Sequence, residues 1–268
     1  MPTLAFTLIG HNEAHNLPRT LESVRWADEL VYVDCESTDG SAEVARKYTP
    51  KVFSRPNVIQ LNANKQFAID QAGTDWVFYL DADEVISPEL AEEIRALLAA
   101  NPPENAFKLP RRNRFFGRWV RHGGQYPDTQ LRLFRRNRAR FPCRHIHERI
   151  EVDGATGTLR EPLDHYTCDT VAVALRKMDF NSTFNAQEMA RGGLRPGVGV
   201  AVRFLVWKPL SRFLRRYFLK GGFRDGWPGL IVAGIDSIDF AFRLFKFWDY
   251  AQHPERLPPA PGGSQGVR

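Results

Sequence analysis

Three clusters of polar side chains in the first 85 residues each follow a short apolar run. The clusters are Gly10-His-Asn-Glu13 after Leu4–Ile9, Asp34-Cys-Glu-Ser-Thr-Asp-Gly40 after Leu30–Val33, and Asp81-Ala-Asp-Glu84 after Trp76–Leu80. In an open α/β sheet, ligands bind beyond the carboxyl ends of the strands. The clusters therefore predict a carboxylate-rich ligand site at one edge of a sheet.

The pair Asp81 and Asp83 has the spacing of a cation site at the end of a strand. If the chain turns just after Leu80, one carboxylate can bind a cation while the other holds a water or a sugar hydroxyl. Mg²⁺ or Mn²⁺ held by few protein ligands completes its coordination with water and substrate phosphates. We therefore expect Asp83, with Asp81, to bind Mg²⁺ or Mn²⁺. The alternative is a strand end that is merely capped.

Four motifs together resemble those of family 2 glycosyltransferases with the GT-A fold, over roughly Thr3 to Val152. They are Leu8-Ile-Gly-His-Asn-Glu13, Val33-Asp-Cys-Glu-Ser-Thr-Asp-Gly-Ser41, Asn64-Lys-Gln-Phe-Ala-Ile69 and Leu80-Asp-Ala-Asp83. Three further segments resemble, more narrowly, the bacterial lipopolysaccharide-core glucosyltransferases that extend the inner-core heptose. These are residues 123–135, His147-Glu-Arg149 and residues 221–229.

The resemblance implies a role for each matching position. His11 would lie beside the nucleobase, where the family usually has tyrosine, and Asp34 would accept the uracil N3 proton. Lys65, where arginine is common, would meet the nucleotide or its phosphates. Asp81 would contact the ribose or the donor sugar, and Asp83 would bind the metal on the diphosphate. Cys35 and Glu36 depart from the more usual Asp-Gly.

Several of these residues also have structural interpretations. Glu13 is a further candidate for nucleotide binding, but Asn12-Glu13 could simply begin the helix that runs toward Val24. Asp39 and Ser41 are expected to turn the chain and cap the following helix rather than contact a ligand. Lys65 on a helix face could be a solvated lysine.

Sugar transfer also needs a base that takes the proton of an acceptor hydroxyl. Asp128 is our first candidate and Glu148 the second, because they are the only acids between Lys108 and Arg149. The alternative for Asp128 is a structural carboxylate paired with arginine. The resemblance places His147 near the diphosphate or the metal. A zinc site at Cys143, His145 and His147 lacks a second ligand cluster and is not expected.

The elements that must position these residues follow a β-α-β-α rhythm from Thr3 to about Ala100, which indicates a parallel sheet covered by helices. The rhythm predicts an α/β domain, and the resemblance implies that it is a Rossmann-like, nucleotide-sugar-binding GT-A domain. A mostly helical, amphipathic C-terminal extension is expected to follow it. The catalytic domain is expected over residues 1–165, with a nucleotide-sugar half (1–100) and an acceptor half (101–165). A helical extension (166–252) and a disordered tail (253–268) follow.

The composition excludes several classes of protein. The chain has 268 residues, of which 43% are hydrophobic and 25% charged, so it is neither a disordered chain nor a small disulfide-stapled protein. Three scattered cysteines fit a reducing compartment. No apolar run is long enough and free enough of charge to suggest a membrane span. We expect a cytoplasmic protein, peripheral on the inner face of the cytoplasmic membrane.

The net charge of +6 is unevenly distributed. Residues 108–149 hold 13 Lys/Arg against two acids, and residues 203–224 hold 7 Lys/Arg and no acid. The first zone could bind RNA through its interleaved aromatic side chains. It lies beside the expected active site, however, so an anionic lipid-linked saccharide explains it equally well, and no nucleic acid is expected.

The second basic zone has the pattern of an amphipathic helix. From Pro209 to Lys220, Leu210 and Leu214 share one side while Arg212 and Arg216 fall on the other. With no acid to balance these cations, we expect residues 203–250 to bind a membrane surface. An ordinary helix packed on the protein is the alternative. Asp239 and Arg243 should form an i,i+4 ion pair.

These observations predict a metal-dependent glycosyltransferase. It would transfer a hexose, glucose being the expected one, from a UDP-sugar to a lipid-anchored saccharide such as the lipopolysaccharide inner core, with inversion. Two alternatives stay open. One is sugar transfer to polyprenyl phosphate, and the other is a basic nucleotide- or RNA-binding protein without catalysis, which would not explain the acidic strand ends.

Overall fold

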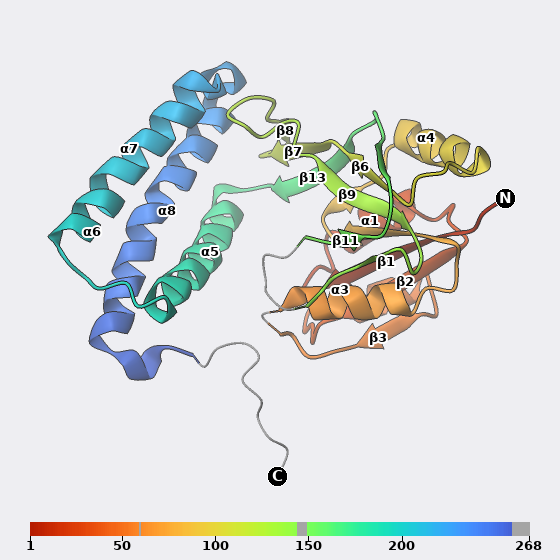
Figure 1. Cartoon of the computed structure of the whole chain (residues 1–268), viewed down its shortest axis with the longest axis horizontal. Coiled ribbons are helices and arrows are strands. Elements are labelled where there is room, and N and C mark those ends of the chain that lie inside the picture. Colours follow the sequence, from red (N-terminus) through yellow and green to blue (C-terminus); the bar gives the residue numbers. More distant parts are fainter. Residues whose placement is uncertain (59, 144–148, 259–268) are drawn as a thin grey trace, which may run out of the picture. The chain divides into compact units, whose positions relative to one another are not determined.

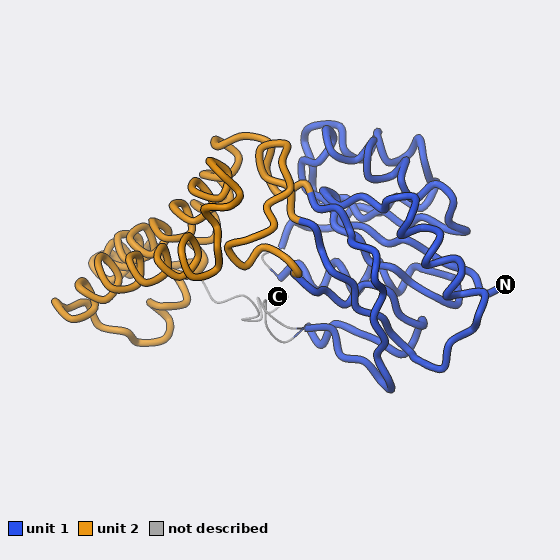
Figure 2. The backbone as a smooth tube through the Cα atoms, turned by 90° about the horizontal axis from the view of Figure 1, so that it is seen from above, with its two compact units in different colours: residues 1–112, 128–165 blue, residues 113–127, 166–268 orange. Residues whose placement is uncertain are grey.

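A computed structural model of the chain describes residues 1–58, 60–143 and 149–258. Two compact units make up the chain (Figure 2). Unit 1 comprises Met1–Arg112 and Asp128–His165, and unit 2 comprises Asn113–Pro127 together with the residues from Tyr166 onward. The candidate catalytic residues in the described ranges all belong to unit 1.

Unit 1 is built on a seven-stranded sheet with the order β12-β6-β9-β4-β1-β2-β3 (Figure 1). Neighbouring strands β4, β1, β2 and β3 run parallel, and β9 is antiparallel to both β4 and β6. The strands are β1 (Leu4–Gly10), β2 (Glu29–Asp34), β3 (Val52–Ser54), β4 (Trp76–Asp81), β6 (Ala106–Leu109), β9 (Gln130–Arg135) and β12 (Thr156–Thr158).

Helices join the parallel strands of unit 1, as the sequence rhythm predicts. They are α1 (Leu17–Ser23), α2 (Ser41–Arg46), α3 (Leu61–Asp70) and α4 (Pro88–Ala99). Helix α4 has the expected start, since Ser87 Oγ accepts from Leu90 N at 3.2 Å and Pro88 occupies the first turn. Helix α3 contains Lys65, as expected of a lysine on a helix face.

Shorter strands complete both units. In unit 1, β5 (Glu84–Val85) pairs with the start of β13 (Leu163–Cys168), and β10 (Ala139–Arg140) pairs with β11 (Glu151–Val152). In unit 2, the end of β7 (Arg111–Phe115) forms a hairpin with β8 (Arg118–Trp119). Positive φ at Phe116 and Gly117 closes that two-residue turn.

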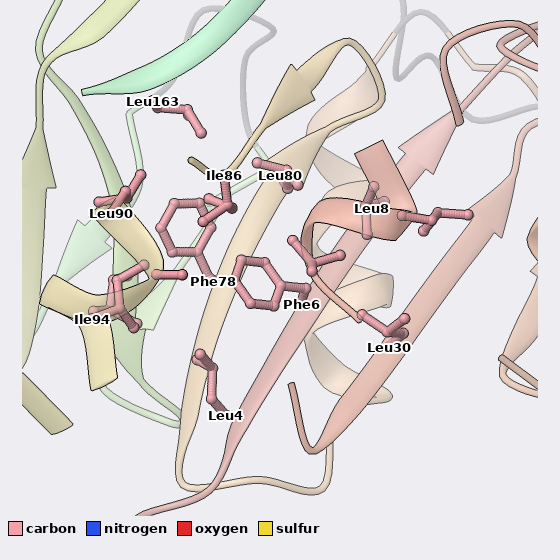
Figure 3. Packing of buried hydrophobic residues seen from close by; sticks show 14 of the residues in the cluster. Leu4, Phe6, Leu8, Leu30, Phe78, Leu80, Ile86, Leu90, Ile94 and Leu163 are labelled. Carbon is pink, nitrogen blue, oxygen red and sulfur yellow. The ribbon is translucent and has the colours of Figure 1, made fainter. Parts of the chain in front are cut away.

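Alternating apolar residues of the strands form the main core of unit 1. Phe6 and Phe78 lie on adjacent strands with ring centroids 5.1 Å apart, and Leu90 and Ile94 of α4 pack against the same cluster (Figure 3). All four are fully buried. Complete burial of such side chains contributes about 1.5–3 kcal/mol each, which fixes the strands whose ends carry the candidate site.

Unit 2 consists mainly of helices (Figure 1). They are α5 (Val171–Arg191), α6 (Val198–Val202), the π-helical η1 (Arg203–Trp207), α7 (Lys208–Phe213), the π-helical η2 (Leu214–Leu219), the 3-10 helix η3 (Gly222–Asp225) and α8 (Gly226–Gln252). Helix α8 packs against both α5 and α7. Its Asp239 and Arg243 form the expected i,i+4 ion pair. No described helix has the length and the apolar character that a membrane span requires.

Inside unit 2, the start of the 123–135 motif meets the 221–229 motif, through contacts that also involve the preceding residues His122 and Lys220. The Asp225 carboxylate accepts from His122 N at 2.7 Å and from His122 Nδ1 at 3.0 Å, and Gly123 N donates to Lys220 O at 2.9 Å. A Cβ on Gly229 would collide with the carbonyl oxygen of Gly222. The glycine-rich segment 221–229 therefore has a structural reason for its composition, because only glycine permits this approach.

The predicted α/β class and the helical C-terminal region are confirmed. The expected tail is described only as far as residue 258, where Pro254–Arg256 form the 3-10 helix η4 and Arg256 Nη1 bonds to Asp249 Oδ1 at 2.6 Å. The rest of that tail lies outside the described residues.

Candidate active site

The three polar strand ends lie at one edge of the sheet of unit 1. The register pairs Gly10 of β1 with Asp34 of β2, and Ile9 of β1 with Asp81 of β4. The carboxyl ends of three adjacent parallel strands thus reach the same level, as the sequence indicates. This is the place where open α/β sheets bind ligands.

A cavity of about 230 Å³ opens at this edge. Most of the candidate residues line it: His11, Glu13, Lys65, Asp81 and Asp83, together with Ile9, Gly10, Cys35, Leu61 and Ala82. His11 is held in place because its Nδ1 lies 2.7 Å from the carbonyl oxygen of Cys35. The fold therefore brings five of the nucleotide and metal candidates to one cavity.

The loops after β1 and β2 are fastened to each other by short polar side chains. Asn12, at a positive φ of 57°, accepts from Thr38 N at 2.8 Å, and Ser41 Oγ accepts from Glu13 N at 2.8 Å. Asp39 accepts from Ala14 N and from Ser41 N, at 2.9 and 3.0 Å. The turning role expected of Asp39 and Ser41 fits these contacts. The expected capping role does not, because the N-cap of α2 is Gly40.

Asp34 is buried at the end of β2 and one of its oxygens lacks a partner. Oδ2 accepts from Ser37 N at 3.1 Å, whereas Oδ1 has no hydrogen-bond partner among the described residues. Asp34 precedes Cys35, which lines the cavity. Asp34 itself does not line the cavity and Oδ1 is enclosed by protein, so a ligand reaches it only after neighbouring side chains shift. A buried acceptor without a donor costs free energy, and an N–H group of a ligand would satisfy it.

Lys65 and Asp81 are the first members of a chain of alternating charges. Lys65 Nζ lies 2.9 Å from Asp81 Oδ1, and Arg132 Nη2 lies 2.7 Å from Asp81 Oδ2. Both cations also lie over the Tyr79 ring, at 5.0 Å and 4.2 Å from its centroid. Each oxygen of Asp81 is thus already paired with a cation, which makes Asp81 less available to a metal ion.

Glu84 and Arg111 continue this chain of charges to Asp128. Glu84 is completely buried, and its Oε1 accepts from Arg132 at 2.5 Å and from Arg111 at 3.2 Å. Its Oε2 accepts from the backbone N of Asp81 at 3.0 Å, which closes the turn after β4. Arg111 then bonds to Asp128 Oδ2 at 2.5 Å. We call these six residues the charge ladder: Lys65, Asp81, Arg132, Glu84, Arg111 and Asp128.

Burial and pairing shift the pKa values within the ladder. Burial alone would raise the pKa of Asp81, but the charges of Arg132 and Lys65 outweigh burial and hold that pKa well below its ordinary value. Burial raises the pKa of Glu84 above its ordinary value, against the lowering effect of Arg132. Burial lowers the pKa of Lys65, and the charge of Asp81 more than reverses this. Asp81 and Lys65 are therefore ionised at neutral pH.

Asp128 has the contacts of an arginine-paired carboxylate. Its Oδ2 accepts from Nε and Nη2 of Arg111, at 2.9 and 2.5 Å, and its Oδ1 accepts from Gln130 at 2.8 Å. These bonds stabilise the ionised form, and a carboxylate stabilised in this way is a weaker base.

Asp83 lies beside a histidine that the sequence analysis did not select. Asp83 lines the cavity, and its Oδ2 is 3.4 Å from Nε2 of His165 on β13. Carboxylate and imidazole are both ligands of divalent metals. No group of three or more metal-ligating side chains gathers within the described residues. The donor set fits a cation held by few protein ligands that takes further ligands from water and phosphate.

Three important residues received no role from the sequence: Glu84, Arg132 and His165. Glu84 was placed in the polar cluster after Leu80, but its link to the arginines was not predicted. Arg132 alternates with apolar neighbours in Leu131-Arg-Leu-Phe134, a pattern that places an arginine on a buried face. His165 has no comparable local signal, since β13 is distant from β5 in sequence and only the pairing of Glu84 with His165 brings it close.

Some candidates lie outside the described residues. These are His147, Glu148 and His145 of the zinc alternative. The described member of that alternative, Cys143, donates from Sγ to the carbonyl oxygen of Phe141 at 3.3 Å.

Much of the first basic zone is neutralised inside unit 1. Arg112 pairs with Asp164 at 2.5 Å and Arg138 with Asp153 at 2.6 Å, in addition to the pairs of Arg111 and Arg132. The positive charge counted over residues 108–149 is therefore larger than the charge available to a ligand.

Comparison with known proteins agrees with this geometry. Residues 8–167 match the profile of "Glycosyl transferase family 2". A lipopolysaccharide core biosynthesis glycosyltransferase of Rhizobium meliloti is 32% identical over 267 residues, which cover 97% of this chain and 96% of the relative. The chain belongs to glycosyl transferase family 2.

More distant relatives are similar over most of the glycosyltransferase chain. An uncharacterized glycosyltransferase of Rickettsia bellii is 29% identical and covers 89% of this chain and 82% of its own. Among solved structures, S. aureus TarS (residues 1–349) aligns with a TM-score of 0.47 at 14% identity, covering 92% of this chain and 88% of that one.

Proposed function

We propose that this glycosyltransferase transfers a hexose from a UDP-sugar to an anionic, lipid-linked saccharide, with the donor bound in the cavity at the ends of β1, β2 and β4. One observation carries the assignment of the base: the buried Oδ1 of Asp34 has no hydrogen-bond partner among the described residues. The N3–H of uracil would satisfy it. An adenine or cytosine ring has a lone pair at the equivalent position and would not.

The cavity also provides charges for the diphosphate and the sugar. Lys65 forms an ion pair with Asp81 and lines the cavity, so its ammonium group can also attract a phosphate bound there. His11 lines the same cavity with an exposed imidazole that can stack on the base. We assign Glu13 to binding of the nucleotide. Both oxygens of Asp81 are paired, so we assign Asp81 to positioning Lys65 and to contacting the ribose or the donor sugar.

Asp83 is the residue that we assign to Mg²⁺ or Mn²⁺, with His165 as its neighbour and Asp81 as a secondary candidate. A divalent cation bound there would neutralise charge on the departing diphosphate. His165→Gln should therefore raise the Mn²⁺ concentration for half-maximal turnover by roughly tenfold or more. His122→Gln, at a histidine of unit 2, is the control and should leave it unchanged.

Asp128 is proposed to remove the proton of the acceptor hydroxyl, with inversion at the anomeric carbon. Arg111 orients its carboxylate through the bond to Oδ2. Asp128→Asn should abolish transfer while UDP binding survives. A variant Asp128→Asn with near-normal turnover, together with an inactive Glu148→Gln, would move the role to Glu148.

The acceptor is inferred from the relatives and from the chemistry of the chain. The Rhizobium meliloti relative is named for lipopolysaccharide core biosynthesis, and we propose an acceptor of that class, with glucose as the sugar. Such an acceptor is anchored in lipid, so the enzyme would work on the cytoplasmic face of the inner membrane. Sugar transfer to polyprenyl phosphate is the enzymatic alternative, and no nucleic acid is required.

The direct test is hydrolysis of nucleotide sugars in the presence of Mn²⁺ without acceptor. UDP-hexoses should be hydrolysed, and Asp83→Ala should abolish the reaction while the protein stays folded by circular dichroism. Hydrolysis confined to purine nucleotide sugars would disprove the assignment of Asp34 to the base. Transfer to purified lipopolysaccharide inner core, compared with polyprenyl phosphate, then decides the acceptor class.

A further inference from the structure

Residues 198–219 of unit 2 form one continuous helical segment from α6, η1, α7 and η2, which we call the outer helix. Large apolar side chains recur along it at every fourth position, and all are exposed: Val198, Val202, Val206, Leu210, Leu214 and Phe218. Their exposed fractions run from 43% at Leu214 to 82% at Val198. We call these six residues the apolar row.

The π-helical turns keep the apolar row straight. In an α-helix a step of four residues overshoots one turn by about 40°, so six residues at this spacing would spiral around the axis. A π-helical turn, closed by i→i+5 hydrogen bonds, contains more residues and drifts the other way. Because η1 and η2 alternate with α6 and α7, the opposite drifts compensate. The row therefore stays on one face.

The opposite face of the outer helix packs on α8. Phe204 is buried against Phe240, with ring centroids 6.2 Å apart. Arg216 Nε and Arg212 Nη1 lie 2.7 and 3.4 Å from Asp236 Oδ2. The expectation that no acid balances these arginines is thus wrong, because an acid from the next helix supplies the balance. Arg212 and Arg216 turn inward, and the apolar row stays exposed on the other face.

Basic and aromatic side chains flank the apolar row, because residues 203, 207 and 215 each come one position after a residue of the row. Arg203 and Arg215 are exposed, and neither has an acidic partner among the described residues. Trp207 lies between them and is 68% exposed. Tryptophan and basic residues beside an apolar stripe are typical of helices that lie in a membrane interface.

We infer that the apolar row inserts into an anionic lipid surface, with Arg203 and Arg215 over the headgroups and the outer helix lying in the plane of the membrane. A second copy of the chain fits this face less well. A symmetric pairing would place the same unbalanced arginines against each other, with no acid on residues 198–224 to separate them. The inference deepens the proposed function and rests on its membrane-bound acceptor.

The test is sedimentation with vesicles of phosphatidylethanolamine and phosphatidylglycerol. Trp207→Ser combined with Leu210→Ser removes the centre of the row and its tryptophan. Because two large exposed side chains leave the interface, binding should weaken roughly thirtyfold. Ile238→Ser with Phe245→Ser is the matched control, since these α8 residues are 52% and 50% exposed but lie off the row. The control should weaken binding less than about threefold.

Three results would overturn the inference: no vesicle binding by the wild-type chain, equal loss in both double variants, or a change of oligomeric state with vesicle binding intact. Circular dichroism and a melting curve establish that both variants are folded. Hydrolysis of UDP-sugar in lipid-free buffer, measured on the same proteins, should be equal in wild type and row variant. Vesicle binding without any such hydrolysis would defeat the proposed function while upholding this inference.

Discussion

Asp34 is the residue that we propose to select the nucleobase. Its Oδ1 is enclosed by protein without a donor, while Oδ2 is fixed by Ser37 N. An acceptor in this situation favours a ligand with an N–H at that position and disfavours one with a lone pair, because the wrong ligand leaves two acceptors facing each other.

Asp34→Asn should therefore change the preference of the cavity from uridine toward cytidine. The amide retains one oxygen for Ser37 N and presents an NH₂ group to the base, which repels uracil N3–H and suits cytosine N3. We expect UDP binding to weaken roughly tenfold or more and CDP binding to improve relative to UDP, by isothermal titration calorimetry. Asp39→Asn, in the adjoining loop, serves as the control. Equal losses for both nucleotides would count against a direct contact with the base.

At the scale of single residues, the sequence predicted the residues that line the cavity wherever they belong to a local motif. His11, Glu13, Lys65, Asp81 and Asp83 line the same cavity, as their positions after the strands indicate. His165 could not be found in this way, because its approach to Asp83 depends on pairing between β5 and β13, which are distant in sequence. The partners of Asp81 were missed for the same reason, since Arg132 reaches it from β9.

At the scale of elements, the charge ladder joins β4, β5, β7, β9 and α3 through ion pairs. Arg132 is its centre, with 1% exposure and bonds to both Asp81 and Glu84. A buried charge that loses its partner is expensive, whereas replacing the whole pair with apolar groups is often tolerated.

Arg132→Met should therefore destabilise the protein by about 3–5 kcal/mol, because two carboxylates are left beneath the sheet edge without their common cation. Adding Glu84→Met should recover part of this loss, since the buried pair is then replaced as a whole. Urea unfolding measures both free energies. Arg138→Met, at an exposed pair with Asp153, is the control and should cost less than about 1 kcal/mol. If Arg132→Met costs no more than this control, the ladder has no structural role.

The ladder also makes stability depend on pH in a defined direction. The pKa of Asp81 lies well below its ordinary value in the folded protein, so the unfolded chain binds this proton more readily. Its contribution is complete above the unfolded-state pKa, about 4, and is lost as the pH falls through the lower folded-state pKa.

Asp81→Asn should accordingly lower the free energy of unfolding by about 2 kcal/mol at pH 7. The difference in this free energy between variant and wild type should narrow as the pH falls below about 4. Urea unfolding at several pH values between neutral and acidic measures this difference. Asp153→Asn provides the comparison, because its pair with Arg138 is largely exposed. A gap that stays constant down to acid pH would contradict the assigned ion pairs.

Element boundaries were predicted best where apolar periodicity and capping agree. The observed strands β1, β2 and β4 match the apolar runs Leu4–Ile9, Leu30–Val33 and Trp76–Leu80 within one residue at each end. The π-helical turns of the outer helix were not predicted, because the apolar and basic pattern of Pro209 to Lys220 fits an ordinary α-helix as well. Nothing local in residues 113–127 indicates that they belong with the helices of unit 2. That grouping depends on contacts such as those of Asp225 with His122.

At the scale of the whole molecule, the net charge of +6 is a poor guide to what can bind an anion. Most arginines of unit 1 named above are paired with acids inside the same unit, and Arg212 and Arg216 of unit 2 are paired with Asp236. Of the cations on the outer helix, Arg203 and Arg215 are those that remain exposed without an acidic partner in the described chain. The salt dependence of membrane binding through the outer helix should therefore reflect two of its five Lys/Arg side chains.

Replacing both Arg203 and Arg215 with glutamine tests this count. Each basic residue near an anionic membrane contributes about 1 kcal/mol, so the double variant should bind phosphatidylglycerol-containing vesicles roughly thirtyfold less tightly at low salt and should lose most of its salt dependence. Arg212→Gln should leave vesicle binding within about threefold and lower the melting temperature instead, because it breaks the pair with Asp236. If Arg212→Gln weakens vesicle binding as much as the double variant does, Arg212 must turn outward on the membrane, and the charge of the whole segment, rather than of one face, would govern binding.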